Sequence, residues 1–171
     1  MGRPGPKVGA WTWKGGEGSD LFRGVTTLNL DVKGRMAIPA RYRERIRESC
    51  ASQLVVTVDN DRCLLLYPAP EWSDIDRKLD AMPSFNKTAR KLQRLYIGHA
   101  HEVEMDAQGR ILLPTELRRF ANLDKHIALV GQGKKFELWD EETWNGRVDD
   151  WFGEVDLDVD DLPPEFGSLS I

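Results

Sequence analysis

One short phrase occurs twice in the sequence, and it combines charged residues suited to contact with a phosphate or a base edge. "LDVKGRMAIPARYR" spans residues 30–43, and "MDAQGRILLPTELR" spans residues 105–118. Each copy places an Asp, two variable residues, a Gly and an Arg ahead of an apolar stretch and a Pro. A guanidinium that is held by a rigid turn and oriented by a carboxylate is prepared for bidentate contact with phosphate or guanine.

The Gly and the Asp of each phrase also have a structural interpretation. Gly34 and Gly109 can adopt positive φ without steric cost, so they predict a tight turn in each copy. Asp31 and Asp106 flank these turns, where a carboxylate commonly accepts bonds from backbone amides. A purely structural use of the Asp residues therefore stands open beside a role in orienting the neighbouring Arg.

The Arg of each phrase is harder to explain by structure alone. Strand alternation places Arg35 and Arg110 on the face opposite the apolar residues of their strands. Arg41 and Arg43 add positive charge near the first turn, and the second copy is less basic. We therefore interpret the Arg side chains as candidate contacts to nucleic acid.

The elements that position these residues also repeat. Each copy predicts a strand, a tight turn, a short strand, a helix after the Pro, an apolar hairpin and a further helix. These segments are residues 25–31, 35–39, 40–48, 53–58, 63–67 and 70–82 in the first copy, and 101–106, 110–114, 115–123, 126–131, 134–139 and a helix after 142 in the second. An amphipathic helix from Phe85 to Tyr96 joins the copies, with Phe85 on its apolar side.

The repeat predicts an α+β fold, mainly β, organised in two halves. A hairpin with one apolar face is not stable alone, so two units in one chain are expected to close over a shared core. The expected parts are a disordered extension at 1–20, a first domain at 21–83, a helical linker at 84–98, a second domain at 99–152 and a flexible acidic tail at 153–171.

Composition narrows the class of protein. The chain has 171 residues, of which 40% are apolar, and its two cysteines, Cys50 and Cys63, do not form a disulfide framework. No apolar run is long enough to span a bilayer, and no secretory signal pattern opens the chain. Twelve acidic residues and one basic residue lie between positions 137 and 171, whereas the residues before them carry a net charge of +7. A basic body with an acidic tail is typical of proteins that handle polyanions. Ordinary solvated surface in both parts is the alternative, and charge alone does not decide between the two.

The repeated phrases carry a resemblance to a known family. "FRGVTTLNLDVKGRMAIPARYR", "MDAQGRILLPTELR" and the "LWDEETW" ending resemble MraZ, over about residues 21–152. MraZ is a family of bacterial DNA-binding regulators with two domains related to AbrB and SpoVT. The resemblance implies an interlocked, swapped-hairpin β-barrel with peripheral helices, and protomers that close into rings.

The same resemblance implies a function. MraZ proteins bind short direct repeats upstream of the division and cell-wall gene cluster, including their own promoter. By position, Arg35 and Arg110 are the implied principal DNA contacts, and Lys33 and Arg23 are implied phosphate partners. The expectation is a cytoplasmic, nucleoid-associated repressor that acts sterically, binds double-stranded DNA and copies of itself, and uses no membrane, cofactor or small-molecule substrate.

Two segments fall outside the resemblance. We expect that Leu21 is the true start of the protein, read from a non-ATG codon, and that residues 1–20 are an artefact of annotation. The alternative is a genuine arm that touches phosphate through Arg3, Lys7 and Lys14, and an intact-mass measurement on natively produced protein distinguishes the two. The acidic tail either aids solubility or competes with DNA for the basic face.

Catalytic and metal-binding interpretations are weaker. His99 and His101 resemble a His-x-His metal motif with Asp106 near, but no further ligand set is evident. Cys50, Cys63 and His126 match no standard zinc-finger spacing, so buried thiols are expected instead. Gly131-x-Gly133 lacks the sequel of a dinucleotide loop and predicts a hairpin turn. We expect no enzyme and no metal site.

The alternative function is that of a protein-interaction or oligomeric scaffold without a specific DNA target. Six tryptophans are many for a chain of this length. Trp72, Trp139 and Trp144 lie at helix-stripe or strand positions that favour packing between subunits. DNA binding that weakens steeply with salt would separate the regulator from the scaffold.

Overall fold

The computed structural model describes residues 21–154 and 163–164. The expectations for residues 1–20, and for most of the tail after residue 154, lie outside these described residues. No helix in the described part of the chain is both long and apolar enough to cross a bilayer.

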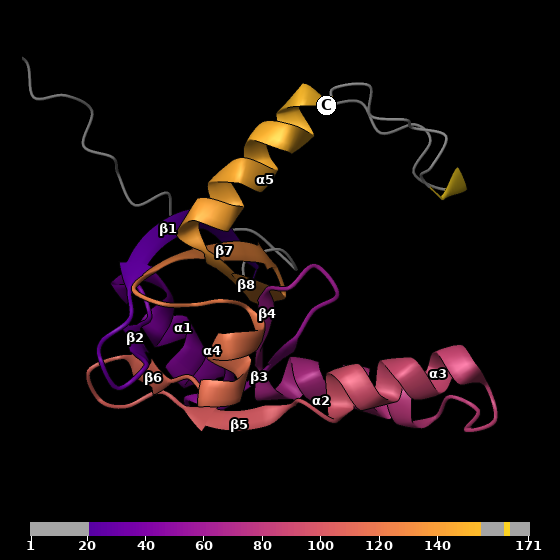
Figure 1. Cartoon of the computed structure of the whole chain (residues 1–171). Helices are drawn as coiled ribbons and strands as arrows, with labels where there is room; N and C mark the ends of the chain where they lie inside the picture. The colour runs from indigo at the N-terminus through magenta and orange to yellow at the C-terminus, as the bar shows by residue number, and fades with distance from the viewer. Residues whose placement is uncertain (1–20, 155–162, 165–171) are drawn as a thin grey trace, which may run out of the picture.

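The two halves follow the same order of elements (Figure 1). The first half contains β1 (Phe22–Asn29), β2 (Arg35–Ala37), α1 (Ala40–Cys50), β3 (Gln53–Val58), β4 (Leu64–Pro68) and α2 (Ala69–Asp80). The linker contains α3 (Lys87–Leu92) and the π-helix η1 (Gln93–Ile97). The second half contains β5 (His101–Glu104), β6 (Arg110–Leu112), α4 (Thr115–Phe120), β7 (His126–Gly133), β8 (Lys135–Asp140) and α5 (Glu141–Gly153).

Strand pairing interlocks the halves. Six strands form an antiparallel sheet in the order β1-β7-β8-β4-β3-β5, and β2 pairs with β6 in a separate two-stranded sheet. In the part of the chain that the structure describes, only β3–β4 and β7–β8 pair within a half; the pairs β1–β7, β3–β5, β4–β8 and β2–β6 each join one half to the other. Exchanging equivalent strands of the two halves reverses the order of the large sheet, so the chain has an internal two-fold relation.

The α+β class with mainly strands is as predicted, but the closed barrel is not found. Within the described residues both sheets are open, and β1 and β5 are the edge strands of the larger one. The chain leaves the large sheet after Asn29, and the strand that returns after the turn is only three residues long. Because β2 finds its partner in β6, neither strand joins β1 to β5 and the large sheet does not close.

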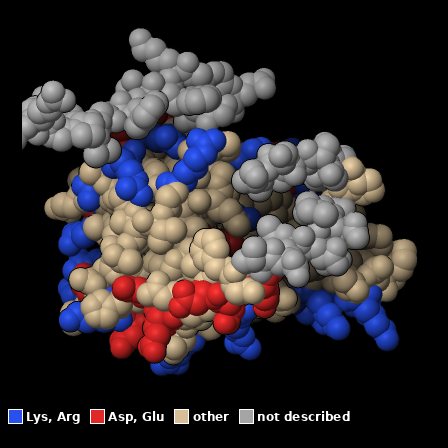
Figure 2. Space-filling model, turned by 90° about the horizontal axis from the view of Figure 1, so that it is seen from above, with Lys and Arg blue, Asp and Glu red and all other residues tan. Residues whose placement is uncertain are grey.

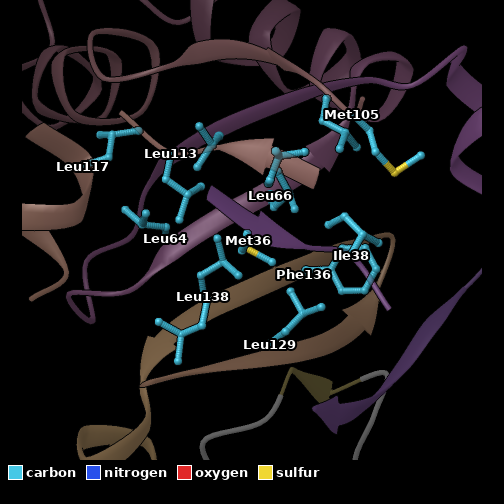
Figure 3. Packing of buried hydrophobic residues seen from close by; sticks show 14 of the residues in the cluster. Met36, Ile38, Leu64, Leu66, Met105, Leu113, Leu117, Leu129, Phe136 and Leu138 are labelled. Atoms are coloured by element: carbon cyan, nitrogen blue, oxygen red, sulfur yellow. The ribbon is translucent and has the colours of Figure 1, made fainter. Parts of the chain in front are cut away.

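The main core lies between the interlocked strands and the helices α1 and α4, and both halves contribute to it (Figure 3). Met36 and Ile38 come from the first half, and Phe136 and Leu138 from the second, and each is at most 1% exposed. Helix α1 begins after Pro39, whose φ of −53° suits the start of a helix. The predicted stripe of this helix, Tyr42 and Ile46, is buried in the same core.

The peripheral helices cover the sheet unequally. Helices α2 and α3 with η1 cover a second apolar cluster that includes Trp72 and Leu79, whereas α5 contacts Trp139 mainly through Trp144 and has no buried residue. Phe85 was expected on the apolar side of the linker helix but is 85% exposed. Its position explains the difference, because Asn86 caps α3 with its side chain and Phe85 precedes the helix.

Candidate nucleic-acid interface

The first hairpin turn is organised by one carboxylate. Asp31 accepts hydrogen bonds at Oδ1 from the backbone amides of Lys33 (2.9 Å) and Arg35 (2.8 Å). Its Oδ2 accepts the Nε–H of Arg35 at 2.8 Å, which makes an ion pair. Gly34 has φ +86° and donates its amide to the Asp31 carbonyl at 3.0 Å. The structural and orienting roles considered for this Asp are therefore performed by the same side chain.

The second hairpin turn repeats this arrangement. Asp106 accepts at Oδ1 from the amides of Gln108 (3.0 Å) and Arg110 (2.8 Å), and at Oδ2 from Nε of Arg110 (3.1 Å). Gly109 has φ +79° and donates to the Asp106 carbonyl at 2.9 Å. The two copies of the phrase thus encode one backbone design.

These hydrogen bonds set the ionisation of both carboxyls. The backbone amide of Arg35, followed by its side chain, lowers the pKa of Asp31 from 3.8 to about 2. The amide of Arg110 and then its side chain likewise lower the pKa of Asp106, against an opposing effect of desolvation. Both groups are therefore carboxylates at neutral pH and hold the guanidinium beside them.

Both phrase arginines leave the same face of the small sheet. In the β2–β6 register Arg35 pairs with Leu112, Met36 with Ile111, and Ala37 with Arg110. Residues paired across an antiparallel ladder share a face, so Arg35 and Arg110 lie diagonally on one side, with backbones roughly 7–8 Å apart. Met36 and Ile111 occupy the opposite, buried side. The two Arg side chains are 33% and 37% exposed, so each is partly accessible to a ligand.

The tips of the two turns differ in chemistry. Lys33 and the fully exposed Val32 occupy the first tip, whereas Gln108 and Ala107 occupy the second. Gln108 accepts a hydrogen bond from Nη2 of Arg110 at 3.2 Å. Among the described residues, no hydrogen bond engages the Nη atoms of Arg35 in the corresponding way.

Two of the other predicted contacts lie on neighbouring elements, β1 and α1. Arg23 is exposed on β1, and its carbonyl accepts the hydroxyl of Tyr42. Arg41 is exposed on α1, donates from Nη2 to Oγ1 of Thr26 at 2.6 Å, and lies over the Tyr42 ring. Both are therefore cations on a surface built by β1 and α1.

Arg43 differs from the other predicted contacts because its side chain faces the opposite half of the molecule. Its Nε donates to the carbonyl of Ile38 at 2.7 Å, and its side chain lies against Gly109. Arg118 makes the equivalent bond to Leu113 (3.1 Å). The sequence analysis assigned no role to Arg118. Its place at the end of the second phrase, equivalent to that of Arg43 in the first, could have indicated one.

Arg118 lies against Gly34, so each glycine turn has an arginine of the other half packed on it. A Cβ atom added at Gly109 would lie within 2.8 Å of Nε, Cδ and Cζ of Arg43, and one at Gly34 within 2.9 Å of Cζ, Nε and Nη1 of Arg118. Positive φ favours glycine at both positions, and a Cβ atom at either position would displace the arginine side chain that packs on it.

Surface charge is unevenly distributed. Figure 2 shows Lys and Arg at several places around the molecule, among them the edge on the same side as β2 and β6 in Figure 1, and a band of Asp and Glu on the face toward the viewer. A polyanion that approaches the edge with the small sheet therefore meets a positive surface.

The residues considered for metal binding do not assemble into a site. Within residues 21–154 and 163–164 no group of three or more His, Cys, Asp or Glu side chains could hold a metal ion. Cys50 and Cys63 are free and buried, as predicted. Burial raises the pKa of the Cys63 thiol well above its usual range, with smaller contributions from Glu137 and Asp59.

The doubled phrase lies within the part of the chain that matches a known family. The family model for MraZ protein matches residues 21–95 and 96–150. A transcriptional regulator MraZ from Methylococcus capsulatus is 54% identical over 151 residues, which cover 88% of this chain and 99% of that protein. Relatives of the same name from Thioalkalivibrio sulfidiphilus and Coxiella burnetii are 59% identical over 136 residues and 51% identical over 152 residues. They cover 80% and 88% of this chain, and 91% and 100% of their own lengths.

The family resemblance seen in the repeated phrases is thereby confirmed. The name transcriptional regulator, which these relatives share, does not denote a class of enzyme. Both halves of the chain, including both hairpin turns, fall within the matched residues. The chain therefore belongs to the MraZ family of transcriptional regulators.

Proposed function

We propose that this regulator binds double-stranded DNA sequence-specifically through the two hairpin turns of the β2–β6 sheet. The observation that carries the proposal is the emergence of Arg35 and Arg110 from one exposed face, each fixed by an Asp through Nε. A guanidinium held in this way presents its outer nitrogens to the O6 and N7 atoms of guanine in the major groove. Lys33, Arg23 and Arg41 supply phosphate contacts around these two readers.

Binding energy favours an assembly of several protomers. One bidentate contact between Arg and a base provides ~1–3 kcal/mol of discrimination. A selective regulator needs roughly 4–10 kcal/mol over non-specific binding, and two such contacts supply only ~2–6 kcal/mol, the lower part of that range. A ring of protomers on short direct repeats provides the rest, because every contact after the first is intramolecular. We therefore propose a ring-shaped homo-oligomer with an AbrB-like arrangement of interlocked hairpins.

The proposed targets are direct repeats upstream of the division and cell-wall gene cluster, including the protein's own promoter. The support is the membership of the MraZ family. Occupying promoter DNA represses transcription sterically, so the mechanism uses no cofactor or small molecule. The protein would act in the cytoplasm, associated with the nucleoid.

An electrophoretic shift assay on the protein's own upstream DNA tests the proposal. Specific binding should require tandem repeats in suitable phase and should weaken steeply as salt rises. Arg35→Ala should remove specific binding and leave the fold intact, as measured by circular dichroism. Tight binding of a single isolated repeat would contradict the multivalent model, and an Arg35→Ala variant with unchanged affinity would contradict the assignment of the reader.

A scaffold without a DNA target is the second candidate, favoured by helix α5. Trp151 and Phe152 are 43% and 74% exposed, and Trp151 makes edge-to-face contacts with Trp139 and Trp144. Such a surface suits a protein partner or a second copy of this chain. In that case the upstream DNA and a scrambled duplex would bind equally at every salt concentration.

A further inference from the structure

We propose that Arg43 and Arg118 are positioning residues that lock each hairpin turn to the opposite half of the molecule. The lock is a property of the fold, and its effect on DNA reading rests on the proposed function. By sequence, Arg43 was predicted to contact DNA. The contacts around it instead assign it a structural role, which is to hold in position the two reading arginines, Arg35 and Arg110.

The lock begins with a hydrogen bond inside each half. Nε of Arg43 donates to the carbonyl of Ile38, and Nε of Arg118 donates to the carbonyl of Leu113. Each acceptor lies just after the short strand that carries a reading arginine. Through these bonds, helices α1 and α4 each fix the backbone just after the short strand of their own half.

The same two residues then bond across the internal two-fold. The amide of Ile38 donates to the carbonyl of Gly109 at 2.8 Å, and the amide of Leu113 donates to the carbonyl of Gly34 at 3.0 Å. Ile38 and Leu113 thus each accept a hydrogen bond from the arginine of their own half and donate one to the glycine turn of the other half. The two glycine turns are coupled through Ile38 and Leu113.

The arginine side chain closes each loop of contacts. Arg43 lies so close to Gly109 that a Cβ atom there would overlap three of its heavy atoms, and Arg118 lies on Gly34 in the same way. Arg118 is held further by a bond from Nη2 to Oγ1 of Thr115 at 3.0 Å. Each arginine side chain therefore packs directly against the glycine turn of the opposite half.

This geometry has a direct consequence for the reading arginines. Arg35 and Arg110 directly follow Gly34 and Gly109, so a shift of either glycine moves the guanidinium beside it. Bidentate contacts require positioning within about 0.5 Å and 10–20°. Two turns that are locked to each other hold Arg35 and Arg110 at a constant separation.

A direct phosphate contact is the competing role for Arg43 and Arg118. Both side chains are half-buried, and their Nε–H groups are already bonded to backbone carbonyls. A residue that mainly neutralises phosphate changes the salt dependence of binding, whereas a positioning residue does not. Mobility of the opposite turn and salt dependence of binding together distinguish the two roles.

The first experiment measures amide hydrogen exchange by NMR on the full chain, without DNA. Arg43→Gln should speed exchange about tenfold at Ile38, Gly109 and Arg110, and Arg118→Gln should do so at Leu113, Gly34 and Arg35, because each variant loses a charged hydrogen bond. Arg119→Gln removes a neighbouring, exposed charge from α4 and should leave all these amides unchanged. Unchanged exchange at the opposite turn in both variants would overturn the lock.

A second variant guards against a failure to fold. Arg43→Met keeps the apolar stem that packs on Gly109 and removes the donor to Ile38. It should fold and show faster exchange at Gly109 in the same direction. A folded Arg43→Met protein with wild-type exchange at Gly109 and Ile38 would also overturn the proposal.

The second experiment measures Kd for the protein's own upstream DNA and a scrambled duplex at several salt concentrations. Arg43→Gln should weaken binding to the upstream DNA about tenfold with an unchanged slope of log Kd against log salt. Arg41→Gln, at a proposed phosphate contact, should flatten that slope by about one. A flattened slope for Arg43→Gln with normal exchange at Gly109 would assign it to phosphate instead. If the wild-type protein does not prefer its upstream DNA, the proposed function fails, and hydrogen exchange still decides the lock.

Discussion

The two hairpin turns share one backbone and differ at their tips. In both, an Asp accepts two amides and an Arg Nε, a glycine with positive φ makes the turn, and an arginine of the opposite half packs on that glycine. At the tips, Val32 and Lys33 of the first hairpin correspond to Ala107 and Gln108 of the second. The shared residues therefore build the turn, and the differing tip residues are the ones that can change what each turn contacts.

This difference at the tips predicts that the two hairpin turns contribute unequally to DNA binding. Nη1 and Nη2 of Arg35 have no hydrogen-bond partner within the described residues, Lys33 adds a cation, and the exposed Val32 can contact a thymine methyl. Arg110 is held by Gln108 as well as by Asp106, and its tip is uncharged. We therefore expect the first hairpin to contribute more of both affinity and specificity.

Removing each reading arginine should have the largest effect and tests this asymmetry. Arg35→Ala should abolish preference for the upstream DNA, because every protomer of an assembly loses its stronger hairpin turn. Arg110→Ala should retain a measurable preference, with a loss per contact near the lower end of ~1–3 kcal/mol. Fluorescence anisotropy with labelled upstream and scrambled duplexes measures both. Equal losses would show that the tips do not differ in their use.

Glycine substitutions test the contact between each hairpin turn and the arginine of the opposite half. Gly34→Ala and Gly109→Ala each impose positive φ on a Cβ and push against an arginine, whereas Gly133→Ala at φ +77° meets nothing within 4 Å. The φ strain costs roughly 1–3 kcal/mol at all three positions. Overlap with Arg118 or Arg43 should add ~1 kcal/mol or more to the loss in free energy of unfolding. Urea denaturation curves measure the difference, and three equal losses would contradict the close packing.

Exchanging the tip residues should have a smaller effect and should act in opposite directions. Lys33→Gln makes the first tip resemble the second, so the salt slope of binding should flatten by about one per engaged hairpin. Gln108→Lys should steepen the slope by the same amount and release Nη2 of Arg110. Titrations at several salt concentrations measure both slopes. If neither substitution alters the slope, the tips do not approach phosphate.

The smallest effect concerns the pH dependence of the turns. Because the folded pKa of Asp31 is lowered from 3.8 to about 2, its stabilisation is fully present above pH 3.8 and is lost as pH falls toward 2. The lowered pKa of Asp106 gives the same sign. Carboxyl titration by NMR should find both midpoints below 3.8. Arg35→Ala should raise the Asp31 midpoint only partway, since the amide of residue 35 still donates; a midpoint of 3.8 in the wild-type protein would contradict the hydrogen bonding.

Much of the local structure follows from the sequence. The Asp and Gly of each phrase predict the turn, the Pro predicts where α1 and α4 begin, and alternation predicts the exposed face for Arg35 and Arg110. These features depend on residues within one turn or one strand of each other. Turn chemistry and side-chain periodicity suffice to predict such features.

The contacts between the halves could not be predicted in this way. Local patterns do not specify that β2 pairs with β6 in a separate open sheet, or that Arg43 packs on Gly109. Arg43 carries the same charge as Arg41, and only the packing of α1 against the other half distinguishes their environments. Phe85 was misplaced because helical spacing does not reveal the residue at which a cap begins the helix.

The most direct test of the account is the affinity of wild-type, Arg35→Ala and Arg110→Ala proteins for tandem upstream repeats, a single repeat and a scrambled duplex over a range of salt. The account predicts tight, salt-sensitive binding of the tandem repeats by the wild-type protein. It also predicts weak binding of the single repeat and loss of the preference in Arg35→Ala. Equal binding of all three duplexes by the wild-type protein, or full preference retained by Arg35→Ala, would contradict it.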